Sequence, residues 1–224
     1  MICASDIKIL PSSATFIDIG CAFGTDVRKL YVDGVPFRQI FAVDENPDFY
    51  HLGMDLYEDS ESRTKELNLH FSVANILVPE FSSKVSNLLL VGINKLKNNV
   101  LLISSLDSSS QDTLLDVVYL GSVLHLMNEE QCKLTIANCR KILKSKGILF
   151  GRTVGNDAPI QETRGSLHAD LRFLHSPESL KALLIENGFQ EDSIVIEWKP
   201  VEWNKFDKAS PENKRLLSFF ARVV

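Results

Sequence analysis

Short apolar runs of strand length alternate with longer helical stretches along most of this chain. The apolar runs fall at residues 14–20, 39–44, 69–76, 114–126, 147–155, 193–198 and 216–224. Helical patterns lie between them: one extends to about Val32, two cover 47–56 and 128–147, and one opens at Ser176. Strands that alternate with helices are typical of a parallel, doubly wound sheet with helices on both faces. No helix separates the last two runs, so the sequence predicts a Rossmann-like α/β fold with a mostly parallel seven-stranded sheet whose last strand is antiparallel.

The length and composition fit one folded domain. The chain has 224 residues, of which 45% are hydrophobic and 24% are charged. This is enough apolar material for one substantial core and too little chain for two comfortable domains, so a single domain over 1–224 is expected. The same balance excludes a wholly disordered chain. The net charge of -5 counts against nucleic-acid binders, which usually carry a basic surplus.

The segment 128–147 carries the clearest helix signals. Asn128 is a good N-cap residue, and Gln131 follows three residues later, as in a capping box. Cys132 and Cys139 are seven residues apart, so on a helix they share one face and are expected to be small buried residues. Gly147 is predicted to end the helix as its C′ residue.

The stretch 79–113 carries mixed signals. It contains the apolar letters LLLVGI and NNVLLIS, followed by the serine-rich SSLDSSSQD. These mixed signals predict an irregular helix and a flexible loop.

The four cysteines show neither disulfide nor zinc-site spacing. They stand at positions 2, 21, 132 and 139, and none forms a C-x-x-C pair. A reduced, intracellular protein without a metal site is therefore expected. The N-terminal residues lack the apolar core of a signal peptide, and no apolar run approaches the roughly 18 residues that span a bilayer. The sequence predicts a cytoplasmic protein that does not enter membranes.

The segment FIDIGCAFGTD, residues 16–26, carries the strongest functional signal. It places Asp18, Gly20, Ala22 and Gly24 two residues apart, in the pattern D-x-G-x-A-x-G, between a predicted strand and a predicted helix. Glycines in such a loop allow tight turns and let a ligand approach the main chain. The unpaired N–H groups of the next helix then lie beside that ligand. In open parallel sheets, ligands bind at the carboxyl ends of the strands.

Asp44 ends the second predicted strand, 26 residues beyond Asp18. A carboxylate there can accept hydrogen bonds from both hydroxyl groups of a ribose. A dinucleotide-binding fold uses an acid in the same place, but its G-x-G-x-x-G pattern is missing here. Asp44 could alternatively be the N-cap of the next helix.

At these residues the sequence resembles class I S-adenosylmethionine-dependent methyltransferases. FIDIGCAFGTD looks like their glycine-rich first motif, and LDVVYLG, residues 115–121, looks like their fourth-strand motif. Within the class, the segments IDIGCAFGTDVRKLYVDGVP, HLGMDLY, GILFGRTVG and HSPESL resemble fungal methyltransferases of terpenoid and meroterpenoid biosynthesis. The resemblance spans about residues 14 to 200. It implies S-adenosyl-L-methionine as the cofactor and S-adenosyl-L-homocysteine as its product.

The resemblance also implies a cofactor site. Its residues would be Asp18, Gly20, Cys21, Ala22, Gly24, Asp44, Glu45, Asn75, Ile76 and Leu120. The glycine-rich loop would shape the pocket for the methionine part, and Asp44 would hold the ribose with Glu45 beside it. Asn75 stands where many relatives have an aspartate that contacts the adenine amino group, and its amide oxygen could accept that bond. Asn75 could equally cap a turn.

Two histidines are candidates for a catalytic base. Methyl transfer needs mainly alignment of the acceptor, because the sulfonium group already activates the methyl group. A hydroxyl acceptor would also benefit from a base, whereas a carboxylate would not. His125 follows the fourth predicted strand and His175 precedes the Ser176 helix. His125 could instead be a core histidine, and His175 an ordinary loop residue.

These features predict a methyltransferase that acts on an oxygen atom of a small-molecule acceptor. The acidic net charge disfavours an RNA substrate. The amino-methylating enzymes of adenine or glutamine carry an N/D-P-P-Y/F/W tetrapeptide after the fourth strand. This chain has YLGS there, which argues against that class of enzyme. Two alternatives stay open: a cofactor-binding partner subunit with little activity, and a protein or nucleic-acid methyltransferase. The sequence leaves the oligomeric state open.

Overall fold

The computed structural model describes residues 14–61, 70–96, 114–163, 171–200 and 213–224. The chain forms two compact units. The N-terminal unit contains Met1–Tyr119 and Lys141–Lys144, and the C-terminal unit contains Leu120–Arg140 and Ser145–Val224. The single domain expected over 1–224 stays a prediction.

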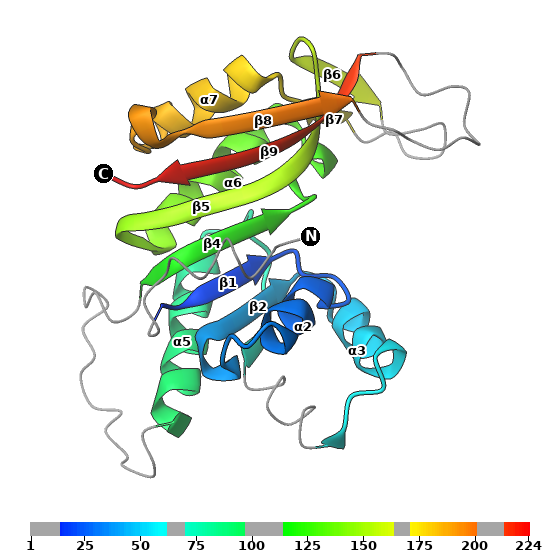
Figure 1. The fold of residues 1–224 in the computed structure, drawn as a ribbon, viewed down its shortest axis with the longest axis vertical. Coiled ribbons are helices and arrows are strands. Elements are labelled where there is room, and N and C mark those ends of the chain that lie inside the picture. Colours follow the sequence, from blue (N-terminus) through cyan, green and yellow to red (C-terminus); the bar gives the residue numbers. More distant parts are fainter. Residues whose placement is uncertain (1–13, 62–69, 97–113, 164–170, 201–212) are drawn as a thin grey trace. The chain divides into compact units, whose positions relative to one another are not determined.

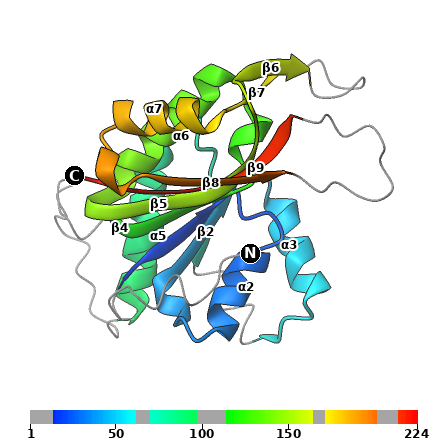
Figure 2. The same cartoon turned by 45° about the horizontal axis from the view of Figure 1, so that its top comes forward.

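The N-terminal unit is a parallel sheet covered by helices. Strand β1 (Phe16–Ile19) pairs in parallel with β2 (Ile40–Asp44), which pairs in parallel with β3 (Phe71–Val73). Helices α2 and α3 lie on one face of β1 and β2, and α5 lies on the other (Figures 1 and 2). The bounds of the helices are α2 Thr25–Val32, η1 Phe37–Gln39, α3 Pro47–Leu56 and α5 Phe81–Leu96.

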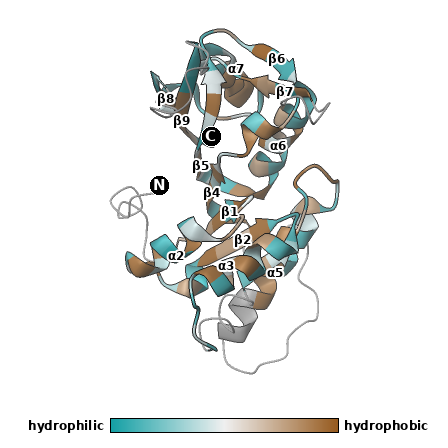
Figure 3. Cartoon of the chain, turned by 90° about the vertical axis from the view of Figure 1, so that its right-hand side faces the viewer, coloured by the Kyte–Doolittle hydropathy of each residue, from teal (hydrophilic) through white to brown (hydrophobic). Residues whose placement is uncertain are grey.

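The core of this unit explains why its strands are continuous apolar runs. Every residue of β1 and β2 is buried, because helices cover both faces of the sheet. Figure 3 shows much of β2 in the colour of hydrophobic residues. Phe41 in β2 and Tyr50 in α3 are among the largest fully buried side chains. The segments that follow the carboxyl ends of these two strands carry the candidate site.

The C-terminal unit is built around antiparallel strands. Strand β9 (Lys214–Arg222) lies between β5 (Leu143–Asn156) and β8 (Val195–Pro200) and is antiparallel to both. Helices α6 and α7 lie together on one face of these strands (Figure 2). The remaining elements are η3 Leu124–Leu126, α6 Glu129–Ile142, β6 Ile160–Thr163, β7 Leu171–Leu174, α7 Pro177–Glu186 and η4 Glu191–Ser193.

The strand order confirms the predicted fold class. Seven strands follow the order β3-β2-β1-β4-β5-β9-β8, in which β4 is Leu115–Gly121. The order reverses at β1 and β4, as in a doubly wound fold. The last strand is antiparallel, as the missing helix between the last two apolar runs predicts.

Helix α6 departs from prediction at one end. Its beginning is confirmed: the Gln131 N–H donates to Asn128 Oδ1 at 2.9 Å, and the Asn128 N–H donates to Gln131 Oε1 at 3.0 Å. The predicted end is wrong, because α6 stops at Ile142 and Gly147 belongs to β5. The Gly147 carbonyl accepts from the Val223 N–H at 2.9 Å. Residues 143–147, which the local sequence predicts to be helical, therefore form a strand because β5 pairs with the last strand of the chain.

Two further elements differ from prediction. The antiparallel hairpin of β6 and β7 was not predicted; half of its eight residues are polar, and half are exposed. An ion pair between Arg172 and Glu162 joins its strands, and Lys214 Nζ lies 2.9 Å from the same carboxylate. In the described part of this stretch, residues 79–96, the structure has a regular helix, α5, instead of an irregular one. The predicted flexible loop lies outside the described residues.

Among the helices that the structure describes, none is both long enough and apolar enough to span a membrane.

Candidate functional site

The glycine-rich loop between β1 and α2 is fixed by main-chain hydrogen bonds to the end of β2. The N–H groups of Gly20 and Cys21 both donate to the Val43 carbonyl, at 2.8 and 3.2 Å. The Gly24 N–H donates to the Cys21 carbonyl at 2.8 Å. The loop therefore turns tightly at the carboxyl ends of two neighbouring parallel strands, where α/β sheets bind ligands.

This loop uses left-handed backbone conformations at alternate residues. The φ angles are 72° at Gly20, 46° at Ala22 and 68° at Gly24. Glycine adopts such angles without strain, which is the physical reason for the two glycines. At Gly24, an added Cβ would lie only 2.6 Å from Arg28 Nη1. Gly24 is also the N-cap of α2 and offers no side-chain cap to the helix.

The Asp44 carboxylate joins the loop to the end of β2. Its Oδ2 accepts from the Ala22 N–H at 2.8 Å, and its Oδ1 accepts from the Asn46 N–H at 2.9 Å. Asn46, whose side chain accepts from the Asp48 N–H, is the N-cap of α3. The alternative that Asp44 caps this helix is therefore wrong. Each carboxylate oxygen has two lone pairs, so Asp44 can accept further hydrogen bonds.

Glu45 and Asn75 meet at the ends of β2 and β3. Asn75 Nδ2 donates to Glu45 Oε2 at 2.9 Å, while Asn75 Oδ1 accepts from the Leu77 N–H at 2.8 Å. The amide oxygen thus already forms the turn that the alternative interpretation of Asn75 predicts. A carbonyl oxygen has a second lone pair, which leaves a place for one more donor. Ile76, the next residue, is buried.

Asp18, in β1, and Cys21, in the loop, are both buried inside the unit. Asp18 is only 2% exposed and Cys21 is 7% exposed. Burial raises the pKa of the Cys21 thiol well above its usual value, and the negative charges of Asp18 and Asp44 raise it further. Cys21 is therefore a neutral thiol that packs against the site, and it cannot serve as a nucleophile at neutral pH.

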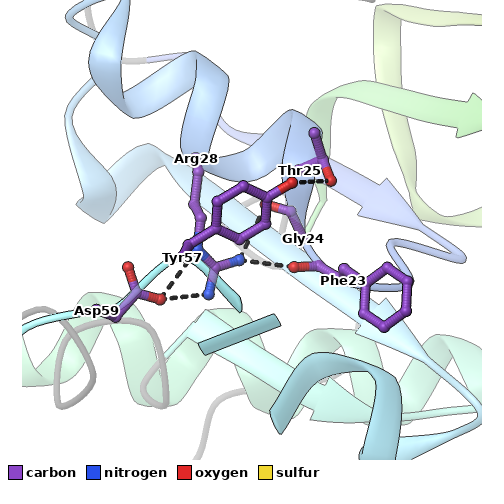
Figure 4. Close-up of polar contacts among 6 residues, drawn as sticks. All are labelled: Phe23, Gly24, Thr25, Arg28, Tyr57 and Asp59. Atoms are coloured by element: carbon purple, nitrogen blue, oxygen red, sulfur yellow. Dashed lines mark hydrogen bonds and ion pairs between the residues drawn. The ribbon is translucent and has the colours of Figure 1, made fainter. Parts of the chain in front are cut away.

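Sequence reasoning missed a buried arginine beneath the loop. Arg28 Nη1 donates to the carbonyls of Phe23 and Gly24, at 2.8 and 3.1 Å (Figure 4). Its Nε and Nη2 both donate to Asp59, and the two side chains form an ion pair. An arginine four residues after Gly24, one helical turn into α2, was the available signal.

The two candidate bases lie in the C-terminal unit, in different settings. His125, in η3, is half-buried, and its Nδ1 lies 3.4 Å from Thr153 Oγ1. His175 precedes α7 and is 4% exposed, with its Nδ1 3.0 Å from Ser179 Oγ. Burial lowers the pKa of His175 to about 4. Its Nε2 is buried and has no hydrogen-bond partner among the described residues.

The structure thus brings most cofactor candidates together in the N-terminal unit. Leu120 is the exception, a fully buried residue of β4 that belongs to the C-terminal unit together with His125 and His175. In the parts of the chain that the structure describes, no group of three or more His, Cys, Asp or Glu side chains could hold a metal ion.

Comparison with known proteins gives the family context of this geometry. No known family model matches the chain. The O-methyltransferase atr3 of Stereocaulon alpinum is 30% identical in an alignment of 166 positions that covers 71% of this chain and 40% of that protein. The O-methyltransferase phiE of a fungal species is 27% identical in an alignment of 233 positions, gaps included, that covers 93% of this chain and 66% of that protein.

A solved structure shares the fold. The Burkholderia thailandensis 1,6-didemethyltoxoflavin-N1-methyltransferase was crystallised with 1,6-didemethyltoxoflavin and S-adenosylhomocysteine. It matches this chain with a TM-score of 0.57 at 16% identity, over 94% of this chain and 71% of its own. This chain has the class I methyltransferase fold.

The resemblance to class I methyltransferases, and among them to fungal ones, is thereby confirmed. The methyltransferase fold also accounts for the position of the loop, since β1 and β2 are central parallel strands whose carboxyl ends carry Gly20 and Asp44. The chain spans about two fifths of the length of atr3 and about two thirds of phiE.

Proposed function

We propose that this protein is an S-adenosylmethionine-dependent methyltransferase that methylates an oxygen atom of a small molecule. The observation that carries the proposal is the loop of Gly20, Ala22 and Gly24, whose central N–H donates to the Asp44 carboxylate. This bond couples the ligand-facing turn to the acid at the end of the next strand. Relatives named O-methyltransferases support the reaction, and the bound S-adenosylhomocysteine of the Burkholderia enzyme supports the cofactor.

The polar groups at this edge of the sheet fit the parts of the cofactor. Asp44 keeps acceptor capacity for ribose hydroxyl groups after its two main-chain bonds. Asn75 keeps one lone pair for the adenine amino group. The uncapped N-terminus of α2 suits the carboxylate of the methionine part. The buried carboxylate of Asp18, in β1, would favour its ammonium group through charge rather than by direct contact. S-adenosylmethionine would supply the activated methyl group, and the chain would hold and orient the reactants.

Of the two histidines, we assign the role of general base to His125. An efficient base has a pKa near the working pH, so that it is unprotonated yet still attracts a proton. Burial lowers the pKa of His175 to about 4, which makes it a weak base, and its side chain is almost fully covered. His125 is half-buried, and Thr153 orients its ring. A carboxylate acceptor would need neither histidine.

Calorimetric titration with S-adenosylhomocysteine tests the cofactor assignment. The wild-type protein should bind, and Asp44→Asn should bind at least about tenfold more weakly, because the amide lacks the charge and one acceptor oxygen. Asp48→Asn is the matched control, since Asp48 contacts the site only through its main-chain N–H to Asn46. Equal affinities of wild type and Asp44→Asn would refute the ribose assignment.

A panel of acceptors tests the reaction. Hydroxylated and carboxylated small molecules should be methylated by the wild-type protein, and His125→Gln should slow only the hydroxyl acceptors. Cofactor binding without turnover across the whole panel would instead favour the partner-subunit alternative. Methylation of proteins or nucleic acids, with none of small molecules, would favour the third function.

A further inference from the structure

Arg28 and Asp59 form a buried ion pair next to the glycine-rich loop. The side chain of Arg28 is 8% exposed and that of Asp59 is fully buried. Both Nε and Nη2 of Arg28 donate to the same oxygen of Asp59. A buried ion pair contributes little net stability, because removing two charges from water costs about as much as their attraction returns. The position of this pair therefore points to a role other than stability.

The remaining donor of Arg28 acts on the loop itself. Nη1 donates to the carbonyls of Phe23 and Gly24, the last two residues before α2 (Figure 4). These peptide bonds are trans, so the C=O and N–H of each point to opposite sides. Holding the two carbonyls therefore also fixes the directions of the N–H groups of Gly24 and Thr25.

Neighbouring side chains hold the guanidinium in place. It lies 4.9 Å from the ring centre of Tyr57 and 5.8 Å from that of Tyr50. Tyr57 Oη is 2.7 Å from Thr25 Oγ1, which ties the first turn of α2 to the end of α3. Gly53 of α3 packs directly on the Phe23 carbonyl, where an added Cβ would lie 2.1 Å from the oxygen. The loop is thus enclosed from one side by residues of α2, α3 and the segment that follows α3.

We propose that Arg28, held by Asp59, is the positioning residue of the glycine-rich loop and sets the affinity for S-adenosylmethionine. This inference rests on the proposed function. Arg28 acts through the main chain: it fixes the Phe23 and Gly24 peptides, and these present the loop and the first turn of α2 to the cofactor. Lysine cannot replace it, because one ammonium group cannot match the planar fork that serves two carbonyls and a carboxylate.

Three variants separate positioning from stability. Arg28→Lys keeps the charge, and Asp59→Asn removes the partner charge. The double variant Arg28→Met/Asp59→Leu replaces the ion pair by apolar side chains, which often restores stability. For each, the midpoint of thermal unfolding is measured together with the Kd for S-adenosylhomocysteine and the kcat and KM for S-adenosylmethionine.

The expected result is a loss of affinity that does not follow stability. Arg28→Lys should raise the Kd and KM about tenfold, with a smaller change in kcat, because the loop is displaced while the acceptor side is untouched. The double variant should unfold near the wild-type temperature and still bind about tenfold more weakly. Asp59→Asn should lose less affinity than Arg28→Lys but more than none, because Arg28 is still present without its charged partner.

The ion pair of Asp116 and Lys144 provides the matched control. It lies in the same unit, where Asp116 also accepts from Thr15 at the amino end of β1, away from the loop. Asp116→Asn should lower the unfolding temperature without changing the Kd. If the wild-type protein binds and the Kd values of the variants change only in proportion to their unfolding temperatures, the positioning role is wrong. Absence of wild-type binding at millimolar ligand would overturn the proposed function itself.

Discussion

The two units carry their candidate functional groups in opposite ways. In the N-terminal unit, the loop is held through main-chain atoms: Asp44 accepts from two backbone N–H groups, and Arg28 donates to two backbone carbonyls. In the C-terminal unit, His125 and His175 contact the hydroxyl groups of Thr153 and Ser179. A site formed by main-chain atoms can be recognised in the sequence, because its turns require glycines at particular positions. The pKa of a buried histidine, by contrast, depends on the residues that pack around it.

The largest change in stability is expected at Gly53, which packs against the main chain of the glycine-rich loop. Alanine normally stabilises a helix interior by about 1 kcal/mol relative to glycine. Gly53→Ala should instead destabilise the protein by about 3 kcal/mol, because its Cβ would lie 2.1 Å from the Phe23 carbonyl oxygen. Urea unfolding measures the change. Gly34→Ala is the control, since nothing lies within 4 Å of the added Cβ and only its positive φ is strained. A stabilised Gly53→Ala protein would contradict the close packing.

A smaller effect should appear at His175 when the pH falls. Burial lowers its pKa from the usual 6.5 to about 4, so between these values the unfolded chain binds a proton that the folded protein does not. Stability is therefore lost as the pH falls from about 6.5 towards about 4, by about 2 kcal/mol at pH 5.

The histidine effect is measured as a difference between variants. His175→Gln should lose less stability than wild type between about pH 7.5 and pH 5 in urea unfolding, by about the same 2 kcal/mol. His70, whose pKa burial also lowers, is present in both proteins and cancels. The exposed His51→Gln should behave as wild type. Parallel pH profiles of wild type and His175→Gln would rule out the buried neutral state.

The smallest effect concerns a helix cap in the C-terminal unit. Ser176 Oγ accepts from the Ser179 N–H at 3.2 Å, and Ser179 Oγ accepts from the Ser176 N–H at 3.0 Å. Ser176→Ala should cost about 1 kcal/mol of unfolding free energy, as is usual for a lost N-cap. Ser83→Ala, at an exposed position of α5, should cost less. An unchanged stability of Ser176→Ala would show that the cap contributes nothing to α7.

Much of the fold could be predicted because local signals and tertiary packing agree. The bounds of α3 coincide with the predicted 47–56, and Ser176 begins α7 as its N-cap. Prediction failed where pairing over long distances overrides a local signal. Gly147 is such a residue, since it is a helix-ending glycine by sequence and a residue of β5 by its pairing with the C-terminal strand.

For the candidate site, the sequence by itself determined the positions of the glycines and acids. Their spacing reflects a turn with positive φ angles at the end of a buried strand. This constraint acts on residues that are close together in the sequence, so it can be recognised there. Tertiary structure alone decided that Arg28 pairs with Asp59, that Asn75 meets Glu45, and that His175 is buried. The first two are contacts between residues about 30 positions apart, so the sequence around either residue does not show that they meet. The burial of His175 depends on the elements that pack around it, and so does the effect of desolvation on its pKa.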